Sequence, residues 1–345
     1  MNLSNTSVDN VEFQQHDIDD SLELIALKKK GKRNLRLNTT PLHIMLLPAV
    51  LLTLIYAYSP MLGVVIAFQD FSPVNSDGSI FSIFFGSPMA EVNGEPNLFG
   101  NFVHVFGNSD AIRAIRNTLI IAISKIVTMF FSPIILSLLL NEVKNRFVAR
   151  TVQTVVYLPH FLSWVILAGI LVQVLSSTGV INSVLKMIFG DDYPAIMFLQ
   201  KPEWFRPIVI ITNIWKEIGW STIVYLASIS GVDPTLYEAA IMDGASKLRQ
   251  CWHITLPGMR PIIVLNLVLS LQGILGAGFD QIYNLYNVQT YETGDVIDTF
   301  VYRLSFQQSQ FSLGAAVGLL NSVVGMMLIS ISYTLAKKLA NYQIF

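Results

Sequence analysis

Asn213, Lys216, Glu217 and Trp220 fall at helical spacing, so that a helix over this segment would bring their side chains to one face. That face combines an aromatic ring with an amide, an ammonium and a carboxylate group. Such faces bind sugars, because sugar C–H patches stack on aromatic rings while the hydroxyls need donors and acceptors. The sequence therefore predicts a substrate path here. The residues that we expect to extend it are Tyr225, Gln272, Phe279 and Asp280.

Four charged residues lie inside long apolar segments, namely Lys125, Lys216, Glu217 and Asp280. A charge inside a bilayer costs at least about 2.5 kcal/mol and usually faces the interior of a helix bundle. Two bases and two acids can also neutralise one another. Mutual pairing that locks helices together and a polar translocation path are therefore both open interpretations.

A second candidate is the mixed charged and apolar segment EAAIMDGASKLRQCWHITLPGMRP, residues 238–261. Asp233 can cap a helix that begins at Pro234, and Gly244 can end it in the left-handed conformation. We expect a helix, a sharp turn and a second helix, with small and apolar residues at Tyr237, Ala239, Ala240, Ile241, Ala245, Leu248 and Trp252. Such a protrusion fits a groove in a partner, although a solvated connector lying on the membrane surface would share its pattern.

Several kinds of chemistry are missing from the sequence. There is no G-x-x-x-x-G-K-[ST] motif to cradle nucleotide phosphates and no G-x-S-x-G elbow. The five histidines show no metal-ligand spacing, and Cys251 is the only cysteine. The net charge of −1 gives no reason to expect nucleic acid as a partner. We therefore expect neither an enzyme, nor a metal site, nor a cofactor bound by this chain.

The elements that must position these residues are membrane-spanning helices. Of the 345 residues, 52% are hydrophobic and only 13% are charged. Apolar runs of about 20 residues span a bilayer, and lipid offers the backbone no hydrogen-bond partner other than its own helix. The sequence predicts an all-α integral membrane protein with six spans, at His43 to Phe68, Asn117 to Leu140, Val152 to Leu175, Pro207 to Ile229, Ile262 to Leu285 and Ser312 to Ala336. Pro133 and Pro159 are expected to kink the second and third spans.

Positive charge sets the orientation of these spans. Fourteen Lys and Arg residues fall on one face of the predicted topology and six on the other. The face with more positive charge is usually cytoplasmic. Both termini and the 231–261 loop should therefore be cytoplasmic. We expect residues 1–38 to be a mobile polar tail and residues 39–345 to be the transmembrane domain.

The string E-A-A-x-x-D-G-A followed by I-T-L-P resembles the signature loop of permease subunits in binding-protein-dependent ATP-binding-cassette (ABC) importers. Further segments, among them RNTLIIAISKIV, YLPHFLSWVI and GDVIDTFVYRL, resemble carbohydrate-type permeases, most of all the branch for complex oligosaccharides and polysaccharides. The resemblance runs from about residue 28 to the C-terminus. The residues that it places in the ATPase-coupling loop are Glu238, Ala239, Ala240, Asp243, Gly244, Ala245, Leu256 and Pro257.

This resemblance implies a type I ABC importer permease fold in the bacterial cell membrane. It further implies a second homologous permease, two ATPase subunits that use ATP and Mg²⁺, an extracytoplasmic solute-binding protein, and an oligosaccharide substrate. A secondary sugar transporter is the main alternative, but it would need an ion-coupling site and usually inverted repeats. A membrane enzyme that modifies glycans would need paired catalytic groups at the water boundary.

Overall fold

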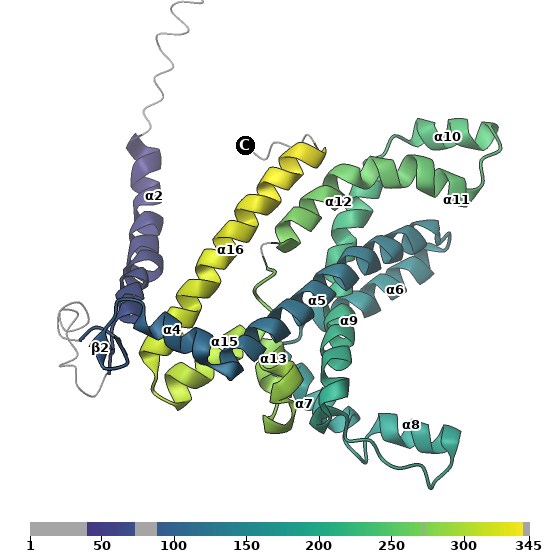
Figure 1. Cartoon of the computed structure of the whole chain (residues 1–345). Coiled ribbons are helices and arrows are strands. Elements are labelled where there is room, and N and C mark those ends of the chain that lie inside the picture. Colours follow the sequence, from purple (N-terminus) through teal and green to yellow (C-terminus); the bar gives the residue numbers. More distant parts are fainter. Residues whose placement is uncertain (1–39, 73–87, 272, 341–345) are drawn as a thin grey trace, which may run out of the picture. The chain divides into compact units, whose positions relative to one another are not determined.

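The computed structural model of the chain describes residues 40–72, 88–271 and 273–340, without the side chains of residue 332 and residues 335–340. The tail predicted for residues 1–38 and the path residue Gln272 lie outside the described residues. The described residues divide into two units, one that ends at Leu62 and one that begins at Gly63 (Figure 1).

The described chain is built almost entirely of helices. The first unit holds α2 (Thr40–Thr53) and the π-helix η1 (Leu54–Tyr58), which lead into the 3₁₀ helix η2 (Ser59–Phe68). One short antiparallel hairpin, β1 (Glu91–Val92) with β2 (Glu95–Pro96), is the exception in the second unit. The helices of the second unit are α4 (Gly100–Gly107), α5 (Ser109–Glu142), α6 (Arg146–Tyr157), η3 (Leu158–Phe161), α7 (Trp164–Val174), α8 (Val180–Phe189), η4 (Phe198–Gln200), α9 (Pro202–Ser230), α10 (Pro234–Met242), α11 (Lys247–Gln250), η5 (Cys251–Thr255), α12 (Leu256–Leu271), α13 (Phe279–Leu285), η6 (Val288–Thr290), α14 (Tyr291–Gly294), α15 (Ile297–Tyr302), η7 (Arg303–Gln307) and α16 (Phe311–Ala340).

Among the described residues, four helical stretches are long and apolar enough to cross a membrane: Thr40–Phe68, Ser109–Glu142, Lys247–Leu271 and Phe311–Ile331. Three of them match the first, second and sixth predicted spans, whereas Lys247–Leu271 overlaps the fifth predicted span only from Ile262 to Leu271. The 29-residue α9 covers the fourth predicted span and is about 43 Å long at 1.5 Å per residue. It carries the charged pair Lys216 and Glu217, which lowers its hydropathy.

The third and fifth predicted spans are not continuous helices. In the third, Arg146–Phe161 and Trp164–Val174 meet at a bend of 104°. Proline at 159 has no N–H to donate, and the Ser163 side chain caps the next helix by accepting from the Ile166 N–H at 3.3 Å. In the fifth, α12 ends at Leu271 and α13 begins only after Gly278, whose φ of +92° suits glycine. The second span, α5, runs as one helix through Pro133.

The core of the second unit lies between the long helices. Helix α5 packs along α9, and α12 packs against both. Phe205, Val209 and Ile121 are fully buried at the centre of one cluster, and Tyr225 and Met259 lie in another. Helix α6 comes so close to α9 that a Cβ on Gly219 would overlap the Val156 carbonyl. Backbone thus packs directly on backbone at this crossing, which fixes η3 beside α9.

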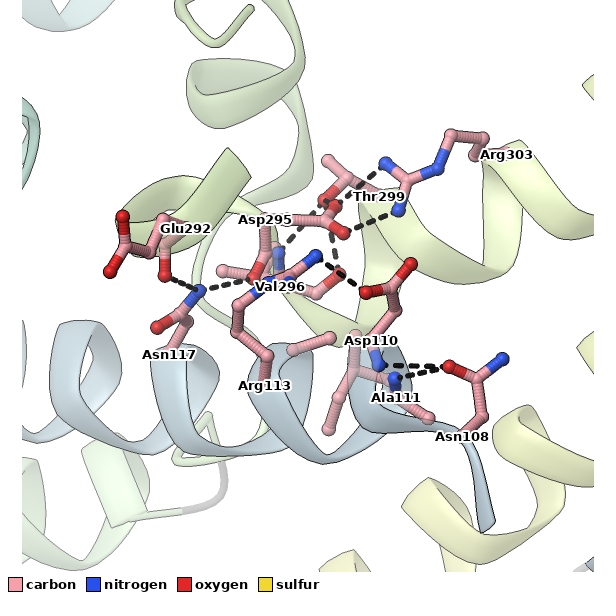
Figure 2. Close-up of polar contacts among 12 residues, drawn as sticks. Asn108, Asp110, Ala111, Arg113, Asn117, Glu292, Asp295, Val296, Thr299 and Arg303 are labelled. Atoms are coloured by element: carbon pink, nitrogen blue, oxygen red, sulfur yellow. Dashed lines mark hydrogen bonds and ion pairs between the residues drawn. The ribbon is translucent and has the colours of Figure 1, made fainter. Parts of the chain in front are cut away.

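Polar contacts fasten α14 and α15 to α5 (Figure 2). The buried Asn117 amide donates to the carbonyls of Glu292 at 3.1 Å and Asp295 at 3.0 Å. Asp295 is fully buried and forms a bidentate ion pair with the Arg303 guanidinium, with N–O distances of 2.5 and 3.1 Å. A buried, hydrogen-bonded pair of this kind holds a single geometry. These contacts hold the short helices α14 and α15 in place against α5.

Candidate functional site

Helices α10 and α11 form a hairpin at one end of the second unit, whereas α8 and α13 lie toward the opposite end (Figure 1). Asp233 caps α10, because its carboxylate accepts from the Thr235 N–H at 2.9 Å, and this hydrogen bond lowers the pKa of Asp233. Gly244 ends the helix with a φ of +72°. The cap, the start at Pro234 and the left-handed turn were all predicted from sequence and are confirmed.

The hairpin is held by contacts at its base and across its turn. The Gln250 amide donates to the Ala245 carbonyl at 2.9 Å, and the Tyr237 hydroxyl lies 2.9 Å from that of Thr255. Val232 packs where a Cβ on Gly258 would lie. The hairpin is thus a preformed element rather than a loose connector.

Apolar side chains on this hairpin face solvent. Met242 is 87% exposed and Leu248 is 70% exposed. The other exposed apolar side chains of the hairpin are Leu236, Ile241 and Trp252. Of the small residues, Ala239 is exposed and Ala240 and Ala245 are half-buried. An exposed apolar patch on a preformed element is typical of a surface that docks into a partner.

The second site is a polar cluster on α9 and η3. Lys216 is buried; its ammonium donates to the His160 carbonyl at 2.8 Å and lies 3.1 Å from a Glu217 oxygen. The other Glu217 oxygen lies 2.7 Å from His160 Nδ1. The His160 ring stacks on Trp220, with centroids 4.8 Å apart and an interplanar angle of 8°. One acid therefore joins two cationic or protonatable groups, and the imidazole covers one face of the indole.

The structure separates the other predicted path residues. Asn213 is half-buried on α9, one turn before Glu217. Lys125 donates to the Ala277 carbonyl at 2.6 Å and contacts Gln281, and both of these partners lie on the α13 side of the bundle. Asp280 was expected inside the fifth span, but it is exposed in the first turn of α13. Pairing is thus seen for Lys216 with Glu217, but these two are neighbours on one helix.

A cavity of about 220 Å³ adjoins the cluster. Trp220 and Tyr225, both predicted, contribute to its lining together with polar groups of α12 at Asn266 and Ser270. Trp220 is 52% exposed, which leaves part of its indole surface open. The arrangement offers an aromatic surface beside hydrogen-bonding groups, but Asn213, Lys216 and Glu217 of the predicted face are not among the residues that line this cavity.

Sequence reasoning missed His160. It considered histidines only as metal ligands, and among the described residues no group of three or more His, Cys, Asp or Glu could hold a metal ion. The local signal was the position of His160 directly after Pro159, where a helix cannot continue regularly. A histidine at such a break can point both its ring and its backbone carbonyl at a neighbouring helix.

Comparison with known proteins gives concordant results. Residues 129–340 match the family model described as binding-protein-dependent transport system inner membrane component. A polygalacturonan/rhamnogalacturonan transport system permease protein, YteP of Bacillus subtilis (strain 168), is 38% identical over 328 residues, which is 94% of this chain and 97% of YteP. Protein LplB of the same organism is 42% identical over 298 residues, covering 86% of this chain and 88% of LplB.

Two solved structures of ABC transporters also match this chain. A chain in the crystal structure of a bacterial ABC transporter involved in the import of the acidic polysaccharide alginate has a TM-score of 0.76 and 39% identity. The match covers 91% of this chain and 99% of that one. A second crystal structure, of the alginate transporter in complex with an alginate pentasaccharide-bound periplasmic protein, gives a TM-score of 0.77 at 39% identity, with 92% and 99% covered.

Proposed function

Because the chain belongs to the family of binding-protein-dependent transport system inner membrane components, we propose that it is one permease subunit of an ATP-driven importer of oligosaccharides. The family makes it a multi-pass membrane transport component rather than an enzyme. The names of YteP and of the alginate transporter both refer to uronate-containing or acidic polysaccharides. The substrates we propose are acidic oligosaccharides from polysaccharide breakdown.

The complete importer contains this chain, a second homologous permease, two ATPase subunits and an extracytoplasmic solute-binding protein. The chain lies in the bacterial cell membrane with both termini and the 231–261 loop in the cytoplasm, which the predicted distribution of Lys and Arg supports. ATP and Mg²⁺ are used by the ATPase subunits, and no cofactor is assigned to this chain.

The observation that carries the coupling role is the rigid hairpin with its exposed apolar side chains. The signature residues Glu238 to Ala245 lie in the second half of α10 and the turn after it, and Leu256 and Pro257 begin α12, which belongs to a stretch long and apolar enough to cross a membrane. An ATPase groove that binds this hairpin gains apolar burial without ordering a loop. When the two ATPases close on ATP, they carry the hairpin with them and tilt the attached helices. The site on α9 is thereby exposed alternately to the two sides of the membrane.

The substrate path passes the cluster on α9. The open surface of Trp220 stacks on a sugar ring, and Asn213, Glu217 and the polar groups of the neighbouring cavity contact sugar hydroxyls. Lys216 neutralises Glu217 and so lowers the repulsion that a uronate would meet from that carboxylate.

A reconstituted complex tests this function. All subunits are assembled in proteoliposomes with the binding protein, and ATP hydrolysis and uptake are measured with galacturonate and alginate oligomers. We expect hydrolysis and uptake to rise together only when both the binding protein and an oligomer are present. Uptake that continues without ATPase subunits, driven by an ion gradient, would refute the proposal and favour a secondary transporter.

A further inference from the structure

A series of aromatic rings runs over α13 to α16, apart from the cluster on α9. Successive ring centroids lie 5.0, 6.0, 5.0, 5.3 and 6.3 Å apart. We call this series the aromatic track, and its six rings are Tyr291, Tyr286, Tyr283, Tyr302, Phe306 and Phe311. Phe279 stacks on Tyr283 beside it, at 5.1 Å and 16°.

The rings are not core residues. Phe306 is 70% exposed and the other five rings are half-buried. A core cluster of aromatics would bury its faces, whereas this series leaves part of each side chain open. The polar residues that follow Phe306 are Gln307, Gln308, Ser309 and Gln310, all exposed. Lipid offers that run of polar side chains no hydrogen-bond partners, so this end of the track requires a polar surrounding.

The backbone beneath the rings is fixed. The Arg303 guanidinium stands 4.5 Å from the Tyr291 ring centroid while it pairs with the buried Asp295 carboxylate. At the other side, Phe279 begins α13 two residues after Ala277, whose carbonyl accepts from Lys125 of α5. The rings are therefore presented on a rigid surface, and binding to them costs little ordering.

We propose that the aromatic track guides an oligosaccharide toward the cluster on α9, one sugar face after another along the rings. The proposal rests on the function proposed above and adds a second contact region to it. The ring spacing is close to the advance of one sugar unit along an extended chain. Stacking needs no particular hydroxyl pattern, so each ring binds a sugar unit weakly. The oligosaccharide can therefore move from one ring to the next. The flanking glutamines and serine exchange hydrogen bonds with hydroxyls as it passes.

The track predicts a dependence on chain length. A dimer covers one or two rings at a time, whereas a hexamer spans several. Loss of one ring therefore lowers the uptake rate of the longer chain more. Removing a packing contact, in contrast, slows both substrates alike.

The test compares uptake of galacturonate or alginate dimers and hexamers, whichever class the wild-type complex transports, by the full complex in proteoliposomes. The variants are Tyr302→Leu, in the middle of the track, and Phe306→Leu. Because the Phe306 side chain is 70% exposed, its replacement leaves the packing of the core unchanged. Phe189→Leu on α8 is the matched control, because Phe189 is 64% exposed and stacks on Tyr193 away from the track. Rates are expressed per assembled complex.

We expect both track variants to lower the hexamer-to-dimer rate ratio by about threefold to tenfold, the range that one aromatic contact is worth, while Phe189→Leu keeps the wild-type ratio. An unchanged ratio in Phe306→Leu and Tyr302→Leu would overturn the track and make these rings a packing or membrane-interface surface. If the wild-type complex transports neither oligomer class with ATP, the proposed function fails and the track with it.

Discussion

At the residue scale, Glu217 uses both of its oxygens. One faces the Lys216 ammonium of its own helix and the other faces His160 of η3. This carboxylate therefore sets the position of the imidazole, which in turn covers one face of Trp220. Pairing and path lining, the two interpretations left open by the sequence, are thus compatible within one cluster.

Trp220→Ala removes the indole on which we place a sugar. We expect substrate-stimulated ATP hydrolysis by the reconstituted complex to fall by about threefold to tenfold at subsaturating oligosaccharide, because one aromatic contact is lost. Trp215→Ala is the matched control, since Trp215 is 47% exposed on the same helix outside the cluster. An unchanged substrate response in Trp220→Ala would remove this residue from the path.

Glu217→Gln separates the two roles of the same cluster. The amide keeps the size and much of the hydrogen bonding but loses the charge opposite Lys216. If assembly falls while transport per assembled complex stays at the wild-type rate, Glu217 serves pairing alone.

At the element scale, the hairpin depends on one backbone conformation. Gly244 has a φ of +72°, and a Cβ there would meet nothing within 4 Å. The penalty for a side chain is thus conformational, about 1–2 kcal/mol, and larger for a β-branched residue.

Gly244→Val should therefore disrupt the turn while membrane insertion is retained. We expect loss of ATPase co-purification or of transport-linked hydrolysis. Gly190→Val gives a matched control, because Gly190 also has a positive φ, +99°, and a Cβ there would meet nothing within 4 Å, but Gly190 ends α8 away from the hairpin. Gly244→Asn should disturb the turn much less than Gly244→Val, because asparagine tolerates the left-handed region. Wild-type transport by Gly244→Val would reduce the hairpin to a connector.

The elements also show what sequence can predict. Asp233, Pro234 and Gly244 act on their own backbone or that of near neighbours, so their roles follow from residue type. The break after Leu271 was missed because Gly273 and Gly276 barely alter hydropathy, and Asp280 was consequently placed inside a span. The contact of His160 with Glu217 joins residues 57 positions apart and depends on the crossing of α6 and α9. No local pattern encodes that crossing.

At the scale of the whole molecule, orientation is the most direct test. Lys247 lies in the hairpin and Asp191 follows α8, toward opposite ends of the second unit (Figure 1), and both are exposed. In a Cys251→Ser background, which removes the only native thiol, a membrane-impermeant maleimide applied to intact cells should modify Asp191→Cys and miss Lys247→Cys until the cells are permeabilised. The reverse pattern would contradict both the orientation and the coupling role.

The glycine at 219 gives the molecule a mechanical property. With no side chain between the α6 and α9 backbones, neither helix can slide past the other without lifting away from it, and close-packed contacts transmit displacement with little compression. Helix α9 leads within three residues into α10, and α6 leads directly into η3. A displacement of the hairpin is therefore passed along α9 and across its backbone contact with α6 to η3. The His160 ring then moves together with the hairpin.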